Sequence, residues 1–295
     1  MSTNIFCVDI GGTKTAFAIY DLSGKELFYK IIPTDPQSGP NNLINRIYAI
    51  VADRLKGVGI GVIASPGPLD CAAGKIINVV TMGWKDVAIV NLFKEKFNFD
   101  FYLINDCNAG ALGVYYECKN QPRSLVYISL STGIGGGIIL DGKLYNGMGN
   151  AGELGHVTVS GDGIKCGCGK YDCVELYSSG SGIERQYERL TGEKLSCADI
   201  AQDARNGGAV SKFVFDNAAD KLKDALTNIK TVLDPQLIVF GGSVCNAKDL
   251  IFNRIDKSIN NLKYVFTGLG GKQVLLGAFV YAISLINGGK YEKWI

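Results

Sequence analysis

The chain is 295 residues long, which is enough for two α/β lobes of ordinary size. Apolar residues make up 47% and charged residues 20%, so the sequence supports a folded core and excludes an intrinsically disordered protein. The net charge is +2 with no long block of like charge, which argues against a nucleic acid or a membrane surface as partner.

Cysteine and histidine usage narrows the chemistry. The nine cysteines are scattered and odd in number, unlike a disulfide framework, and the sequence has neither a signal peptide nor a membrane-length apolar run. We therefore expect a reduced, soluble, cytoplasmic protein. Because His156 is the only histidine, a carboxylate is the better candidate for proton transfer.

The first 118 residues alternate short strands, turns and helices. A glycine turn at 11–13 joins the first two strands, and another tight turn follows at 23–25. Strands are predicted at 5–10, 15–22, 26–32, 57–64 and 101–105. Helices are predicted at 41–55, 88–97 and 108–118.

From residue 125 the pattern starts again. Strand, glycine turn and strand recur at 125–130, 131–137 and 138–140, followed by a tight turn and a strand at 144–146. A helix at 218–233, a buried strand that opens into a Gly-Gly turn over 237–244, and a helix at 273–286 complete the prediction. We interpret the recurrence as an internal duplication; the alternative is two β-meanders that are similar by chance.

The predicted fold class is therefore α/β with mixed sheets in two lobes. The N-terminal lobe is expected over 1–119 and the C-terminal lobe, with its cysteine-rich loop, over 120–272. A C-terminal helix within 273–295 is expected to pack back on the N-terminal lobe.

Both glycine turns have the composition of phosphate-binding loops, because glycine lets backbone N–H groups point together at an anion. The candidate phosphate ligands are Gly11, Gly12, Thr13 and Lys14 in the first turn and Thr132, Gly133 and Gly135 in the second. Asp9, at the end of the first strand, is placed to hold Mg²⁺ through water. Neither turn is a P-loop, since GxxxxGK[ST] is absent, and either one alone is equally typical of an ordinary hairpin.

Asp106 is the candidate general base. It lies where the strand at 101–105 ends and the next helix begins. Phosphoryl transfer needs mainly positioning and charge stabilisation, and one carboxylate near the attacking oxygen is enough. The alternative is that Asp106 or Asn108 serves only as a helix N-cap.

A cysteine–histidine cluster follows in the second half. His156, Cys166, Cys168 and Cys173 supply three thiols and an imidazole, which is a complete tetrahedral Zn²⁺ ligand set. Four protein ligands leave no open position, so we expect a structural zinc rather than a catalytic one. The alternative is three free cysteines beside a buried histidine.

Five motifs resemble those of the ROK family of sugar kinases: DIGGTK (9–14), STGIGGG (131–137), GELGH (152–156), CGCGKYDCVE (166–175) and IVFGGSV (238–244). The resemblance covers essentially the whole chain. It implies a two-lobed actin/hexokinase-like ATPase fold, with duplicated ribonuclease H-like lobes around an interlobe cleft. It also implies ATP, Mg²⁺ and a structural Zn²⁺, and a homodimer or tetramer.

The resemblance also implies roles for individual residues. Asp106 matches the catalytic base that takes the proton from the 6-hydroxyl of the sugar. The sugar-binding positions implied are Asn105, Asp106, Glu153, His156 and Glu175, together with Gly67 and Thr81. Gly241 and Gly242 match the adenosine side of the nucleotide site. His156 would place one ring nitrogen on zinc and the other toward the sugar.

Two positions depart from the family pattern. Asp172 stands where the family usually has glycine, and aspartate tolerates a positive φ better than most residues. The segment INVVTMGW (77–84) lacks the usual Pro-Asn-Leu, and Thr81 falls near the family's sugar-contacting asparagine. The identity of the sugar is therefore the open question.

Within the family, ELGHVTVSGDG (153–163) and the isoleucine before Asn105 are more similar to N-acetylmannosamine kinases than to glucokinases. The expected reaction is phosphorylation of N-acetylmannosamine to its 6-phosphate, and glucokinase is the alternative. An alternative of another class is a non-catalytic sugar sensor or regulator. The family's repressors carry a DNA-binding domain ahead of the kinase-like part, and we expect none here because the first motif begins at Asp9.

Overall fold

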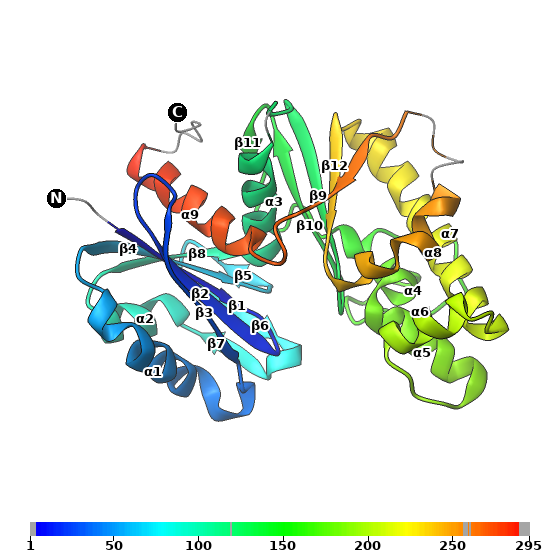
Figure 1. Ribbon diagram of the computed structural model, residues 1–295, viewed down its shortest axis with the longest axis horizontal. Coiled ribbons are helices and arrows are strands. Elements are labelled where there is room, and N and C mark those ends of the chain that lie inside the picture. Colours follow the sequence, from blue (N-terminus) through cyan, green and yellow to red (C-terminus); the bar gives the residue numbers. More distant parts are fainter. Residues whose placement is uncertain (1–3, 119, 256–258, 260, 289–295) are drawn as a thin grey trace. The chain divides into compact units, whose positions relative to one another are not determined.

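The computed structural model describes residues 4–118, 120–255, 259 and 261–288 (Figure 1). The chain divides into two compact units. Unit 1 comprises Met1–Gln121, Ile139–Ala151 and Lys272–Ile295, and unit 2 comprises Pro122–Ile138 and Gly152–Gly271. The last residues of the predicted C-terminal segment, 289–295, lie outside the described part.

Unit 1 is built on a five-stranded sheet in the order β3-β2-β1-β4-β8. The strands are β1 (Asn4–Ile10), β2 (Lys14–Tyr20), β3 (Glu26–Pro33), β4 (Val58–Ser65) and β8 (Asp100–Asn105). β1 to β3 form an antiparallel meander, whereas β4 pairs parallel to both β1 and β8. The predicted strands are confirmed, because their short apolar runs supply the buried residues of this sheet.

Helices cover this sheet. The helices are α1 (Gly39–Val51), α2 (Ile89–Phe97), α3 (Asp106–Glu117) and α9 (Gln273–Ile286). Phe93 and Phe97 of α2 join Phe6 and Phe101 of the sheet in a cluster of edge-on and stacked rings. The predicted helix at 41–55 was too long, since α1 ends at Val51 and a 3₁₀ turn follows.

A small antiparallel sheet in unit 1 was not predicted. It consists of β5 (Leu69–Asp70), β6 (Lys75–Val79) and β7 (Trp84–Val87), in the order β5-β6-β7. Thr81 lies in the 3₁₀ turn Val80–Met82 between β6 and β7. The segment that departs from the family pattern is therefore a hairpin of this sheet.

The second five-stranded sheet has the order β11-β10-β9-β12-β13. Its strands are β9 (Ser124–Leu130), β10 (Ile134–Leu140), β11 (Lys143–Leu144), β12 (Leu237–Gly241) and β13 (Tyr264–Phe266). β12 pairs parallel to β9 and β13, as β4 does to β1 and β8. The repeated strand order confirms the predicted duplication.

Five α-helices of unit 2 bury the apolar residues of its core. They are α4 (Glu175–Ser178), α5 (Gly180–Thr191), α6 (Cys197–Arg205), α7 (Ala209–Leu233) and α8 (Lys248–Ile255). α7 begins nine residues before the predicted start at 218, because Val214 and Phe215 are also buried against the core. The predicted buried strand that opens into a Gly-Gly turn is confirmed, since β12 ends at Gly241.

Two glycines let α3 and α9 cross with their backbones almost in contact. A Cβ atom at Gly113 would lie 2.0 Å from the carbonyl oxygen of Gln273, and one at Gly277 would lie 1.6 Å from that of Ala109. This crossing holds α9 against the helix that begins at Asp106. Within the described residues, no helix has the length and apolarity needed to cross a bilayer.

Replacing Gly113 by alanine should destabilise the protein by about 1–3 kcal/mol, because the added methyl group must push two backbones apart. This steric cost should exceed the stabilisation of about 1 kcal/mol that the higher helix propensity of alanine provides. Gly268→Ala is the matched control, since a Cβ there meets no atom within 4 Å. Equal denaturation midpoints for the two variants would contradict the crossing.

Candidate active site and metal centre

The carboxyl ends of three parallel strands gather the candidate catalytic residues of unit 1. Asp9 of β1 pairs with Ala64 of β4, which pairs with Ile104 of β8. Asp9 and Asn105 therefore lie at the same edge of the sheet, and Asp106 follows directly. Ligands of open α/β sheets bind beyond this edge.

Asn105, rather than Asp106 or Asn108, caps α3. Its Oδ1 accepts hydrogen bonds from the backbone N–H groups of Cys107 (3.0 Å) and Asn108 (3.1 Å). The predicted N-cap alternative for Asp106 or Asn108 is therefore wrong. Asp106 becomes the first residue of the helix, and its Oδ1 accepts from Cys107 N–H at 2.8 Å. A Cβ atom at Gly67 would lie 3.8 Å from Asn105 Nδ2, so the two residues are neighbours.

Burial shapes the electrostatics of the two aspartates. It raises the pKa of Asp9 to about 8, and the nearby charge of Asp106 contributes in the same direction. Burial also raises the pKa of Asp106, against the opposing effect of its hydrogen bond from Cys107. A positive charge at this edge would favour the ionised form of both groups.

The first glycine turn, residues 11–14, is held by its own backbone hydrogen bond and by the hydroxyl of Thr34. Gly11 N–H donates to Lys14 O at 3.0 Å, and Thr34 Oγ1 donates to Gly11 O at 2.6 Å. Gly12, Thr13 and Lys14 are exposed. The Thr81 hydroxyl lies 3.7 Å from where a Cβ atom of Gly12 would be, so the turn and the small sheet adjoin.

The second glycine turn, residues 131–135, is tied to the first residues of α5. Gly180 N–H donates to Ser131 O (2.8 Å), and Ser181 N–H donates to Thr132 O (3.2 Å). Gly135 lies within β10, so the turn between strands is shorter than the predicted 131–137. The turn also contacts Glu175, whose Oε2 accepts from Ile134 N–H at 2.8 Å.

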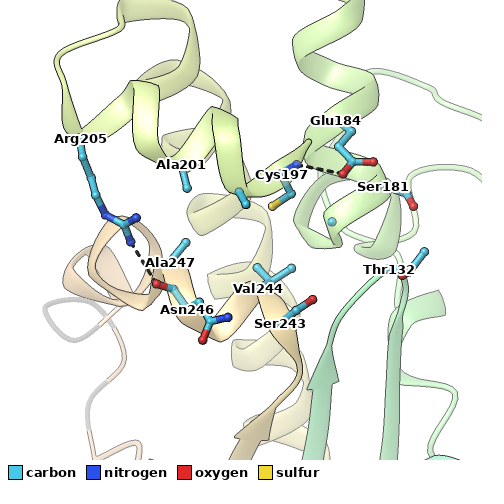
Figure 2. A pocket seen from close by; sticks show the side chains of 12 residues that line it. Thr132, Ser181, Glu184, Cys197, Ala201, Arg205, Ser243, Val244, Asn246 and Ala247 are labelled. Atoms are coloured by element: carbon cyan, nitrogen blue, oxygen red, sulfur yellow. Dashed lines mark hydrogen bonds between the residues drawn. The ribbon is translucent and has the colours of Figure 1, made fainter. Parts of the chain in front are cut away.

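A pocket of about 240 Å³ opens beside this turn (Figure 2). Its walls come from the second glycine turn, α5, α6 and the 3₁₀ turn Ser243–Ala247 after β12. The lining residues are Thr132, Gly180, Ser181, Glu184, Cys197, Ala198, Ala201, Arg205, Ser243, Val244, Asn246 and Ala247. Two of its wall contacts are Glu184 Oε1 accepting from Cys197 N–H (2.9 Å) and Arg205 Nη2 donating to Asn246 O (3.0 Å).

Gly241 and Gly242 do not line this pocket but directly precede Ser243 and Val244, which do. Gly242 has φ +95°, and a Cβ atom there would lie 2.2 Å from Leu130 O. Only glycine permits this close approach between the ends of β12 and β9. Sequence reasoning identified the two glycines but missed the helices α5 and α6. The start of α6 had a usable signal, because Ser196 is an N-cap whose side chain accepts from Asp199 N–H.

The predicted metal ligands lie together in unit 2. The ligand atoms of His156, Cys166, Cys168 and Cys173 are all within 4.8 Å of one another. His156 Nδ1 is 3.6 Å from Cys166 Sγ, and Cys168 Sγ is 3.6 Å from Cys173 Sγ. Thiolates about 2.3 Å from a tetrahedral zinc would be about 3.8 Å apart, so the residues fit this ion.

The other nitrogen of the same ring faces a carboxylate. His156 Nε2 lies 4.0 Å from Glu153 Oε2, and both side chains are partly exposed. Glu175 follows the last cysteine by two positions and begins α4. Glu153 thus lies beside His156 in space, whereas Glu175 is close to the cysteine loop in sequence.

Asp172, which stands where the family usually has glycine, stabilises the cysteine loop. Its φ is +54°, as expected for a position that usually holds glycine. Its Oδ1 accepts from Tyr177 Oη (2.6 Å) and Ile164 N–H (2.9 Å), and its Oδ2 accepts from Gly163 N–H (3.1 Å). Sequence reasoning missed this network, because Tyr177 gives no local signal of its partner.

Curated proteins of several functions and many solved structures are similar to this chain. A glucokinase of Halalkalibacterium halodurans is 32% identical over 84% of this chain and 82% of that protein. An N-acetylmannosamine kinase of Escherichia coli O6:H1 is 31% identical over 80% and 82%, respectively. A xylose repressor of Bacillus subtilis is 29% identical over 91% of this chain and 71% of the repressor.

One of these solved structures is a ROK family glucokinase from Streptomyces griseus in complex with glucose and AMPPNP. It superposes with a TM-score of 0.77, covers 94% of this chain and 98% of the glucokinase chain, and is 28% identical. The extent of this superposition shows that the chain has the hexokinase-like fold of ROK proteins. The ROK family model matches residues 5–278, and this chain therefore belongs to the ROK family.

Proposed function

We propose that this chain transfers the γ-phosphoryl group of ATP to the 6-hydroxyl of N-acetylmannosamine, with Asp106 as the general base. The chain is an ATP-dependent sugar kinase of the ROK family. The observation that carries the proposed mechanism is the position of Asp106. It stands one residue beyond the Asn105 cap and at the same sheet edge as Asp9.

Proton transfer follows from that position. The 6-hydroxyl must lose its proton as its oxygen attacks the γ-phosphorus, and the Asp106 carboxylate accepts that proton. The bond between the γ-phosphorus and the β–γ bridging oxygen breaks in the same reaction, and ADP leaves. The cap fixes the backbone of Asp106, and the bond from Cys107 N–H orients its Oδ1. Desolvation raises the pKa of this carboxylate, which makes it a stronger base than an exposed aspartate.

The nucleotide is assigned to the two glycine turns and the pocket beside the second. The exposed backbone of Gly12 and Thr13 is suited to phosphate oxygens, as is the turn around Thr132. The adenosine would occupy the pocket beneath α5 and α6. Asp9 would hold Mg²⁺, which supplies charge neutralisation for the phosphates, and the ionised carboxylate that burial disfavours fits such a cation.

Polar groups of both units are suited to sugar hydroxyls. Glu153 and Glu175 are acceptors, His156 Nε2–H is a donor when Nδ1 holds the metal, and Asn105 Nδ2 is a donor. Gly67 and Thr81 lie beside Asn105 and the first glycine turn, respectively. A Zn²⁺ held by His156, Cys166, Cys168 and Cys173 would fix the imidazole and the loop before Glu175.

Two observations bear on the choice of sugar. Ile104 is 3% exposed, so it packs in the interior of unit 1 and does not itself make room for an N-acetyl group. The preference for N-acetylmannosamine therefore rests on the 153–163 segment, which contains Glu153 and His156. Glucose is the second candidate substrate, favoured by the similarity to glucokinases.

A panel of sugars with ATP tests the substrate. We expect kcat/KM to be highest for N-acetylmannosamine, at least tenfold above glucose and N-acetylglucosamine, which are the matched comparisons. A preference for glucose would make the chain a glucokinase. Binding of a sugar without transfer to any of them would favour a sensor, the class suggested by the similarity to xylose repressors.

Asp106→Asn should lower kcat by about 10²- to 10⁴-fold while leaving the dissociation constant for the sugar within a few-fold of wild type. The amide keeps an oxygen that can accept from Cys107 N–H, so the start of α3 should be preserved. Asp53→Asn, at an exposed aspartate of the same unit, is the control. If the Asp106 variant turned over normally, the base would be another group.

Metal analysis of protein purified without chelators should give about one Zn²⁺ per chain. Cys168→Ser should remove most of it and weaken sugar binding, because the His156 ring and the loop before Glu175 would lose their anchor. Cys71→Ser is the matched control, since both cysteines are exposed and Cys71 lies outside the cluster. Fully folded, active protein without metal would disprove the structural zinc.

A further inference from the structure

Glu175 is close in sequence to one feature and in contact with another, and the proposed function assigns the two features to different ligands. By sequence it lies two residues beyond Cys173, among the groups proposed to bind the sugar. In space its carboxylate lies against the second glycine turn, which is proposed to bind phosphate. Glu175 and its partner in the turn, Ile134, are 41 residues apart in the sequence.

The contact between Glu175 and the turn is tight. Glu175 Oε2 accepts a hydrogen bond of 2.8 Å from Ile134 N–H, the residue that opens β10. The same oxygen lies 2.5 Å from where a Cβ atom of Gly133 would be, so the carboxylate occupies the space that a side chain would fill. The bond is charge-assisted and therefore stronger than an amide–carbonyl bond.

The turn has its other tethers on the same segment. Gly180 and Ser181 donate to the carbonyls of Ser131 and Thr132. Ser179 links these contacts, because its Oγ donates to Glu175 O and accepts from Gly182 N–H. Three residues of the turn thus take their positions from a segment that begins at the cysteine cluster.

We infer that Glu175 is a positioning residue for the second glycine turn and that it couples sugar binding to nucleotide binding. The inference rests on the proposed function, since it assumes that Glu175 meets the sugar. A sugar hydroxyl that donates to this carboxylate would restrict its rotamers while Ile134 N–H holds the other side. The turn is then ordered before the nucleotide arrives, so the nucleotide loses less entropy on binding.

The coupling is tested by calorimetric titration of AMPPNP with and without saturating sugar. In the wild type, sugar should raise the affinity for AMPPNP at least fivefold. In Glu175→Ala, the sugar-free affinity should fall at least fivefold and the sugar should no longer change it. Wild-type AMPPNP affinity and coupling in this variant would overturn the inference.

Two further variants separate positioning from loss of the sugar contact. Glu175→Gln keeps a carbonyl acceptor for Ile134 N–H, so its sugar-free AMPPNP affinity should stay within twofold of wild type. Glu153→Ala is the matched control, because it removes the other carboxylate beside His156. It should weaken sugar binding and leave the sugar-free AMPPNP affinity unchanged; a loss equal to that of Glu175→Ala would overturn the role of Glu175.

Hydrogen exchange gives a readout that needs no ligand. The Ile134 amide should be protected in the wild type and in Glu175→Gln, and should exchange at least tenfold faster in Glu175→Ala with the zinc content unchanged. Equal protection in all three would overturn the positioning role. Failure of the wild type to phosphorylate any sugar would instead refute the proposed function while the exchange result still stands.

Discussion

The cap at the start of α3 is the constraint on which the candidate chemistry depends. Asn105 Oδ1 accepts hydrogen bonds from two backbone N–H groups, and this places Asp106 at the first helical position, at the edge of the sheet. The glycine crossing of α3 and α9 then holds the rest of the helix. Asp106, the proposed base, is therefore positioned by backbone hydrogen bonds and close packing, which salt screens much less than an exposed ion pair.

In unit 2 the equivalent constraint is the run from Cys173 to Ser181. A metal centre at one end of it would fix the cysteine loop, and the other end holds the second glycine turn by hydrogen bonds to its backbone. The hydrogen bond from Tyr177 Oη to Asp172 Oδ1 joins the cysteine loop to α4. Distortion of this loop would thus reach the turn through short, directional contacts and without any large movement of the fold.

Local patterns predicted most of the sheet strands, the glycine turns and the cysteine cluster, because each is encoded by residues close together in sequence. The Asn105 cap was missed because Asn105, Asp106 and Asn108 are all good N-cap residues, and only the backbone angles distinguish them. The Glu175–Ile134 bond joins distant residues and has no local signature. The assignment of Ile139–Ala151 to unit 1 likewise depends on tertiary contacts that no periodicity encodes.

The two sheets share one strand order but differ in the groups at their carboxyl ends. Asp9 pairs with Ala64 in unit 1, whereas the matching pair in unit 2 is Ser129 and Gly241. The first sheet thus presents carboxylates, whose charge can hold a cation or accept a proton. The second presents hydroxyls and bare glycine backbone, which suit an anion. The duplicated plan thus carries a carboxylate at one sheet edge and backbone donors at the other, and phosphoryl transfer uses both kinds of group.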